Sequence, residues 1–167
     1  VKFVLLGEGD LAGEVRAAVT AAGLEKDVVV AGSIPYEEMP GAVASCAIGI
    51  APYDVEAYPP LTAFGFFWSP LKVFEYLACG LPVVLFGYAG LREHVGEAER
   101  GLAVAPRDLD AFATAIAGLA RDEEARRAMG AAGVAYVRAS HSWADHVAWL
   151  EARLAEAAGG AAGESPS

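Results

Sequence analysis

Basic residues are scarce in this chain. Its 167 residues include 22 Asp and Glu but only 12 Lys and Arg, which gives a formal net charge of −10. This balance argues against nonspecific binding to nucleic acid. The sequence also has no cluster of basic residues that would bind an anionic membrane surface. We therefore expect no nucleic-acid partner. A local site can still bind an anion, because local charge can oppose the charge of the whole chain.

Cysteine and long apolar runs are equally sparse. The two cysteines, Cys46 and Cys79, lie in predicted core segments and are expected to be free thiols of a reducing cytoplasm. No apolar window of about 18 residues is uninterrupted, so no transmembrane helix is predicted, and no signal peptide is evident. Metal-ligand spacing, a Gly-x-Ser-x-Gly turn and a Ser/His/Asp pattern are all missing. We therefore expect no metal, and we expect the three histidines to be helix-surface or capping residues.

What the chain does contain is a regular alternation of strands and helices. Apolar runs predict strands over 2–6, 27–31, 46–50, 82–86 and 101–104. Helical patterns separate them, and a long loop is expected over 52–68. This rhythm predicts an α/β, Rossmann-like fold with a parallel sheet covered by helices on both faces. We expect one domain over 1–157 and a disordered tail over 158–167. Because the chain opens directly in a strand, we expect it to be a piece of a longer protein.

One predicted helix, over 70–79, carries unusual polar residues. Ser69 is expected to be its N-cap and Pro70 its first residue, and its interior is apolar except for Lys72, Glu75 and Tyr76 on one face. One interpretation is that Lys72 and Glu75 pair with each other or lie on a solvated rim. The other is a ligand site, in which free amides and Lys72 hold a phosphate and Glu75 accepts hydrogen bonds from a diol. Both interpretations stay open at this point.

Two further segments were candidates for ligand contact. Gly7-Glu-Gly9-Asp-Leu-Ala12 follows the first strand and matches a dinucleotide-binding fingerprint. The second strand, however, ends in Ala-Gly-Ser rather than in the acid that would hold a ribose, which argues against a nicotinamide dehydrogenase. The aromatic loop over 52–68 either folds over itself, covers a partner domain or contacts a ligand, and its Asp54 and Glu56 are expected to be solvated.

Several segments, in order along residues 2–150, resemble the C-terminal, donor-binding domain of retaining glycosyltransferases with the GT-B fold. They are Gly7-Glu-Gly9, Val30-Ala-Gly-Ser-Ile34, Ser69-Pro-Leu-Lys-Val-Phe-Glu-Tyr-Leu-Ala-Cys-Gly-Leu-Pro-Val-Val84, Ala89-Gly-Leu-Arg-Glu-His-Val95 and Gly101-Leu-Ala-Val-Ala-Pro-Arg-Asp108. The resemblance implies that Glu75 binds the donor ribose, and that Ser33 and Ile34 frame the base. It further implies that Gly7 and Gly9 line the crevice and that Ser69, Pro70, Leu71 and Lys72 lie near the diphosphate.

The resemblance also implies an activity, which is hexose transfer from a nucleotide-diphosphate sugar without a metal or other cofactor. Lys72 is then a candidate to stabilise the leaving group, and the other catalytic residues and the acceptor site are expected in a missing N-terminal half. Many family members carry a second glutamate where this chain has Phe67, which puts the contact to the donor sugar in question. A non-catalytic binding module and a sugar-nucleotide epimerase remain alternatives. The expected location is the cytoplasm, with peripheral attachment to the inner membrane face through the missing half left open.

Overall fold

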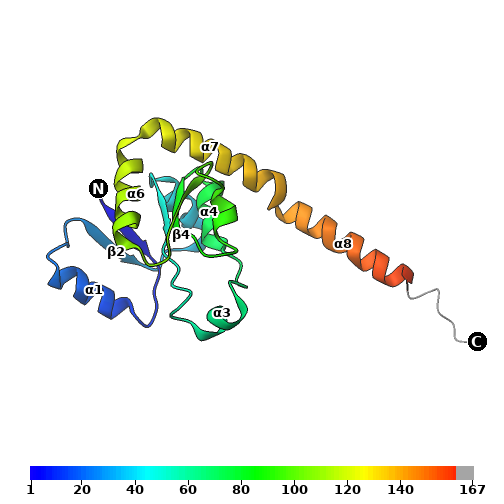
Figure 1. Cartoon of the computed structure of the whole chain (residues 1–167), viewed down its shortest axis with the longest axis horizontal. Coiled ribbons are helices and arrows are strands. Elements are labelled where there is room, and N and C mark those ends of the chain that lie inside the picture. The colour runs from blue at the N-terminus through cyan, green and yellow to red at the C-terminus, as the bar shows by residue number, and fades with distance from the viewer. Residues whose placement is uncertain (161–167) are drawn as a thin grey trace, which may run out of the picture. The chain divides into compact units, whose positions relative to one another are not determined.

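The computed structural model describes residues 1–160 (Figure 1). These residues form two compact units, unit 1 over Val1–Cys46 and unit 2 from Ala47 onward. Each unit is described by itself. The expectation of one donor-binding domain over 1–157 stays a prediction.

Unit 1 is a small parallel βαβ unit. Its elements are β1 (Phe3–Leu6), α1 (Ala12–Ala21), β2 (Val28–Gly32), the 3₁₀ turn η1 (Tyr36–Glu38) and α2 (Met39–Ala44). β1 pairs in parallel with β2, with Phe3 opposite Val28 and a shift in register between Leu5 and Leu6. The Gly7 amide donates to the Gly32 carbonyl at 2.8 Å, which extends the pairing into the turn after β1. The backbone of Gly32 has φ +74°, a conformation that favours glycine.

Unit 2 contains a three-stranded parallel sheet in the order β3-β4-β5. Its elements are β3 (Gly49–Ala51), α3 (Pro59–Phe64), α4 (Leu71–Ala78), β4 (Val83–Phe86), α5 (Arg92–Val95), β5 (Gly101–Val104), α6 (Leu109–Arg121), α7 (Glu123–Ser140) and α8 (Trp143–Gly160). Central β4 is buried along its whole length, as its uninterrupted apolar sequence predicts for a strand covered on both sides. The structure thus confirms an α/β, Rossmann-like fold.

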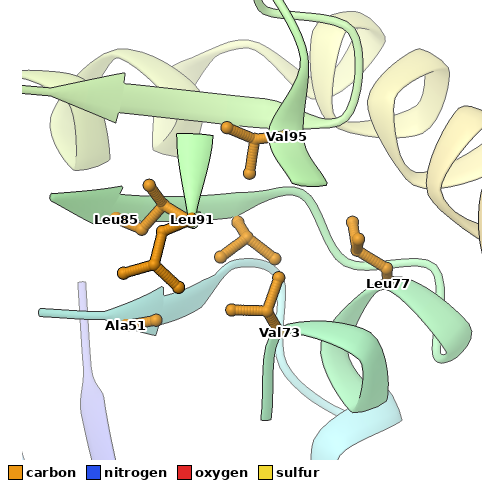
Figure 2. Close-up of a cluster of buried hydrophobic side chains, with 7 residues drawn as sticks. Ala51, Val73, Leu77, Leu85, Leu91 and Val95 are labelled. Carbon is orange, nitrogen blue, oxygen red and sulfur yellow. The ribbon is translucent and has the colours of Figure 1, made fainter. Parts of the chain in front are cut away.

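The core of unit 2 shows how the two faces of the sheet are covered. On one face, β-strand side chains meet α4 and α5 in a cluster made of Ala51, Val73, Leu77, Val83, Leu85, Leu91 and Val95 (Figure 2). On the other face, the Phe86 ring packs on Phe112 of α6, with 4.9 Å between ring centroids. Successive strand residues point to opposite faces, so Leu85 and Phe86 anchor helices on different sides. Burial of this apolar surface is what holds α4 against the sheet.

α7 packs against α4 through glycines. An added Cβ at Gly133 of α7 would lie 3.4 Å from the Leu77 Cα and 2.9 Å from its Cδ2, and one at Gly130 would fall on the Gly80 carbonyl oxygen. Gly80 ends the α4 region with φ +77°, as the sequence predicts for the residue after the helix. Because these glycines have no side chain, the backbones of α7 and α4 approach closely, and this contact helps to fix the position of α4.

Most predicted elements lie within a few residues of the observed ones, with three differences. The third strand begins later than predicted, at Gly49. The segment 52–68 is not only loop, because prolines at its centre start α3. The last helix begins after Ser142, whose hydroxyl accepts from the Asp145 amide at 3.1 Å, and continues to Gly160, past the predicted boundary at 157. Residues 161–167 of the predicted tail lie outside the described residues.

Candidate functional site

The two polar residues predicted to form a site lie on the exposed side of α4. Lys72 and Glu75 are both exposed, whereas Val73 and Leu77 of the same helix are completely buried. This is the division expected of an amphipathic helix, with one stripe in the core and the other toward solvent. α4 therefore presents a cation and a carboxylate together, one turn apart, on one accessible surface.

The start of α4 differs from the prediction. Pro70 is the N-cap residue before the helix, with ψ 59°, and Leu71 is the first residue of the helix. The prediction that Ser69 is the N-cap and Pro70 the first helical residue is therefore wrong. The Ser69 carbonyl instead accepts from the Leu71 amide at 2.9 Å, and the Pro70 carbonyl accepts from Val73 at 2.8 Å. Pro70 itself is buried.

This start leaves fewer free amides than the sequence suggested. Because Leu71 and Val73 already donate to backbone carbonyls, the first turn retains the Lys72 amide, which has no hydrogen-bond partner among residues 1–160. A helix N-terminus favours anions through such free amides. At α4, an anion would thus meet mainly the backbone amide and the side-chain ammonium of Lys72.

Lys72 is placed by an aromatic ring that the sequence analysis did not single out. Its Nζ lies over the Tyr53 ring, 5.0 Å from the centroid, and Tyr53 follows β3 by two residues. The ring face attracts the ammonium without neutralising it. Burial, followed by the charges of Tyr76 and Glu75, raises the pKa of Tyr53 to about 12. Tyr53 therefore stays neutral at physiological pH, and Lys72 keeps its net charge for a ligand.

Glu75 makes no ion pair with any of residues 1–160, and in particular none with Lys72. Of the two interpretations of this pair, a direct ion pair is thus contradicted by the geometry. The remaining choice is between a solvated rim and a ligand site. An exposed carboxylate without a protein partner can accept two hydrogen bonds from a diol without first losing a contact.

The other predicted contact residues belong to unit 1. Gly7 and Gly9 lie in the turn after β1, and an added Cβ at either would meet nothing within 4 Å. Ser33 and Ile34 follow β2, and Ser33 is exposed. Both segments follow the carboxyl ends of parallel strands, where α/β proteins place their ligands. The structure brings Ser69, Pro70, Leu71, Lys72 and Glu75 together in unit 2, and the unit 1 residues form a separate set.

The aromatic loop of unit 2 folds over itself, one of the alternatives that the sequence left open. Tyr58 and Trp68 lie with their ring centroids 4.9 Å apart, and Tyr53 meets Phe66 edge-on at 5.3 Å. Phe67, which takes the place of the family's second glutamate, is 55% exposed and lies 6.2 Å from the Trp68 ring. No carboxylate replaces the missing one at this position, so the role of Phe67 stays an open prediction.

Asp54 and Glu56 are exposed, as predicted, but they are not simply solvated. Both accept from the guanidinium of Arg107, at 3.0 Å and 2.9 Å. Neither Arg107 nor Tyr53 was among the predicted site residues. A tyrosine two residues past a strand end is a signal that could have found Tyr53, whereas Arg107 lies more than fifty residues from its partners and no local pattern points to it.

His94 is half-buried, which corrects the expectation of a helix-surface histidine. It belongs to α5 and faces α4 and α7, where its ring contacts Phe74 at 4.8 Å between ring centroids and its Nδ1 lies 3.1 Å from the Tyr136 hydroxyl. His141 is close by, with 6.1 Å between the two imidazole centroids. Burial lowers the pKa of His94 from its ordinary value of 6.5; the nearby Glu93 carboxylate opposes this, and His141 adds to it.

This lowered pKa predicts a pH-dependent stability. Below the ordinary value the unfolded chain binds a proton that folded His94 does not, so the stability present at neutral pH is lost as the pH falls through the folded pKa. We expect the urea midpoint to fall between about pH 7.5 and about pH 5.5, and to fall less in His94→Gln. Exposed His146 supplies the control, because His146→Gln should keep the slope of the unmodified chain. Identical slopes in all three proteins would contradict this role of His94.

Two surface hollows of unit 2 lie away from Lys72 and Glu75. One, of about 230 Å³, is lined by Ala47, Gly80, Pro82, Glu123, Arg126 and Arg127. The other, of about 290 Å³, is lined by Arg92, Gly96, Glu97, Ala98, Leu102 and Ala103. Lys72 and Glu75, which are both exposed, line neither of these two hollows. Across residues 1–160, no group of His, Cys, Asp and Glu is arranged to hold a metal, and no helix there has the length and apolar character to cross a bilayer.

Comparison with known proteins places this chain in a family. Residues 1–122 match the glycosyl transferases group 1 family. The chain is 30% identical over 168 residues to the 2-deoxystreptamine N-acetyl-D-glucosaminyltransferase of Streptomyces fradiae, covering 98% of this chain and 37% of that protein. It is 32% identical over 160 residues to a GDP-mannose-dependent alpha-(1-6)-phosphatidylinositol monomannoside mannosyltransferase of Mycolicibacterium smegmatis, covering 92% and 38%.

A solved structure agrees on the fold. The sucrose-phosphate synthase of Thermosynechococcus elongatus superposes with a TM-score of 0.78 at 24% identity, covering 96% of this chain and 39% of that one. The chain therefore spans less than half the length of each protein with which it is compared. The family match and the α/β architecture agree with each other, and the chain belongs to the glycosyl transferases group 1.

Proposed function

We propose that this chain binds the nucleotide-diphosphate sugar donor of a hexosyltransferase. The observation that carries the proposal is the exposed face of α4, where Glu75 has no protein partner among the described residues and Lys72 lies one turn away. Glu75 would accept hydrogen bonds from the ribose hydroxyls, and Lys72 would contact the diphosphate. A carboxylate next to a cation suits a ligand that has a diol next to a phosphate.

In the transfer reaction, negative charge grows on the departing diphosphate. A cation aimed at that charge lowers the barrier, since it stabilises the transition state more than the bound donor. Lys72 can supply this, because neutral Tyr53 places its ammonium without cancelling its charge. The matched relatives act on hexosyl groups, N-acetyl-D-glucosaminyl in one and mannosyl in the other, which supports a hexose donor.

The relatives do not indicate which acceptor this protein would use, because their printed names specify different acceptors. The printed name of one specifies 2-deoxystreptamine, and that of the other specifies a phosphatidylinositol monomannoside. We propose that acceptor binding belongs to a separate N-terminal half, with which this chain would act at the cytoplasmic face of the membrane or in the cytoplasm. A non-catalytic binding module would share the donor site, and sugar transfer by the two halves together would distinguish it from an enzyme.

The proposal is tested by calorimetric titration of the chain with uridine, guanosine and adenosine diphosphates and with the matching nucleosides. Saturable binding of one diphosphate, stronger than that of its nucleoside, is the expected result. Absence of binding by every nucleotide would overturn the proposal.

Lys72→Met is expected to weaken binding of the diphosphate about tenfold and to leave binding of the nucleoside unchanged, because only the diphosphate meets the ammonium. Arg127→Met is the matched control. Arg127 is also an exposed cation of unit 2, but it lines a hollow beside Ala47 and Pro82, which precede the strands, so it lies at the opposite edge of the sheet. An equal loss for diphosphate and nucleoside in Lys72→Met would contradict the role given to Lys72.

A further inference from the structure

Arg107 connects two loops at the carboxyl edge of the unit 2 sheet. It lies in the turn after β5, and its guanidinium donates from Nη2 to Asp54 Oδ2 at 3.0 Å and from Nη1 to Glu56 Oε2 at 2.9 Å. Asp54 and Glu56 belong to the loop after β3. One side chain therefore holds together the segments that follow the two outer strands of this sheet.

The backbone of Arg107 is itself unusual. Its φ is +61°, in the left-handed region that residues with a Cβ rarely adopt. Glycine would fit this turn better, so the arginine is not explained by backbone preference. A gain in stability from the ion pairs does not explain the arginine either. The Arg107 side chain is 56% exposed, and exposed ion pairs contribute little to the stability of the folded state.

The loop after β4 reaches the same place. Tyr88 follows β4, and burial raises the pKa of its hydroxyl, with further contributions from the Glu56 and Asp54 carboxylates. The Tyr88 hydroxyl itself is buried. The loop after β4 thus places a buried hydroxyl under the electrostatic influence of the two carboxylates that Arg107 holds.

This network lies directly beside the residue that places Lys72. Tyr53 immediately precedes Asp54, and its ring lies under the Lys72 ammonium, 5.0 Å from ring centroid to Nζ. Asp54 is thus held by Arg107 on one side and joined to Tyr53 on the other. Movement of the 52–56 segment would move the Tyr53 ring and with it the preferred position of Lys72.

We propose that Arg107 is a positioning residue of the donor site, which acts on the diphosphate through Asp54, Tyr53 and Lys72 without touching it. The inference rests on the proposed function, in which Lys72 contacts the diphosphate. In this proposal, the solvent-exposed ion pairs of Arg107 position the side chain that contacts the ligand and do not serve mainly to stabilise the fold.

The test compares diphosphate and nucleoside affinities by calorimetry in the full chain, with the urea midpoint of each variant measured alongside. Arg107→Gly removes the guanidinium and suits the left-handed backbone, and Arg107→Lys keeps the charge but loses the planar, two-armed guanidinium that contacts Asp54 and Glu56. Both are expected to weaken diphosphate binding by about threefold to tenfold, with nucleoside binding unchanged. Arg107→Gly should not lower the urea midpoint, since glycine relieves the unfavourable φ of residue 107.

A charge effect and a positioning effect are separated by the double variant Asp54→Asn/Glu56→Gln. It makes the site more positive, so electrostatics alone would strengthen diphosphate binding. Loss of positioning would weaken it, which is the result we expect. In a Lys72→Met background, Arg107→Gly should have no further effect, because its influence passes through Lys72.

Three outcomes would overturn the inference: unchanged diphosphate affinity in Arg107→Gly, tighter binding in the double variant, or full additivity with Lys72→Met. These are distinct from failure of the proposed function, which would show as an unmodified chain that binds diphosphate no better than nucleoside.

Discussion

Glu75→Ala is expected to bind the preferred nucleotide diphosphate about 10- to 100-fold more weakly than the unmodified chain. The carboxylate is exposed on α4 and has no ion pair among the described residues, so its hydrogen-bonding capacity is available to the ribose. Hydrogen bonds to a charged group contribute about 1.5–3 kcal/mol, and about 1.4 kcal/mol corresponds to a tenfold change. Calorimetric titration of both proteins measures the difference directly.

Titration with a second ligand tests whether the loss of affinity in Glu75→Ala comes from the contact with the ribose. The 2′-deoxy form of the nucleotide should bind the unmodified chain more weakly than the ribose form, and Glu75→Ala should no longer distinguish the two. Glu124→Ala is the matched control, since it removes an exposed carboxylate at the start of α7 and should leave affinity unchanged. If Glu75→Ala binds as tightly as the unmodified chain, the ribose contact does not exist.

Gly130→Ala is expected to destabilise the chain by about 3 kcal/mol, a large effect for the addition of one methyl group. The added Cβ would fall on the Gly80 carbonyl oxygen, and backbone on both sides prevents an inexpensive adjustment. Because Gly80 ends the α4 region, relief of the clash has to move α7 or α4. The free energy of unfolding in urea measures the effect.

Gly118→Ala is its control, with the opposite expected sign. Gly118 lies in α6, is exposed, and has nothing within 4 Å of an added Cβ. Alanine there should stabilise the chain by about 0.5–1 kcal/mol, because glycine is the less favourable residue within a helix. Gly133→Ala should be intermediate, since the Leu77 Cδ2 atom that it approaches can rotate away. Equal stabilities of Gly130→Ala and Gly118→Ala would show that the close approach of α7 to α4 is not maintained.

Contacts between residues close together in the chain are those that a sequence can predict. Asp108 caps α6 and Asp122 caps α7, each accepting from the amide three residues on, at 2.9 Å and 2.8 Å. Such a cap depends only on a few adjacent residues. Ser69 is also a residue type that caps helices, but Pro70, which is buried, occupies the N-cap position of α4 instead. The prediction that His94 lies on a helix surface was wrong because α5 has only four residues, which are too few to show from the sequence which face the core covers.

The sequence by itself determined the α/β alternation, the burial of β4 and the presence of a cation and a carboxylate on one face of α4, because hydrophobic periodicity and helical spacing are properties of neighbouring residues. Only the tertiary structure decided that Lys72 lies over Tyr53, that Glu75 is left without an ion pair, and that Arg107 holds Asp54 and Glu56. These contacts join residues far apart along the chain, which meet because parallel strands bring their following loops to one edge of a sheet. The strand order and the packing of the sheet decide which loops meet there, and the spacing of residues within a single motif does not determine either of them.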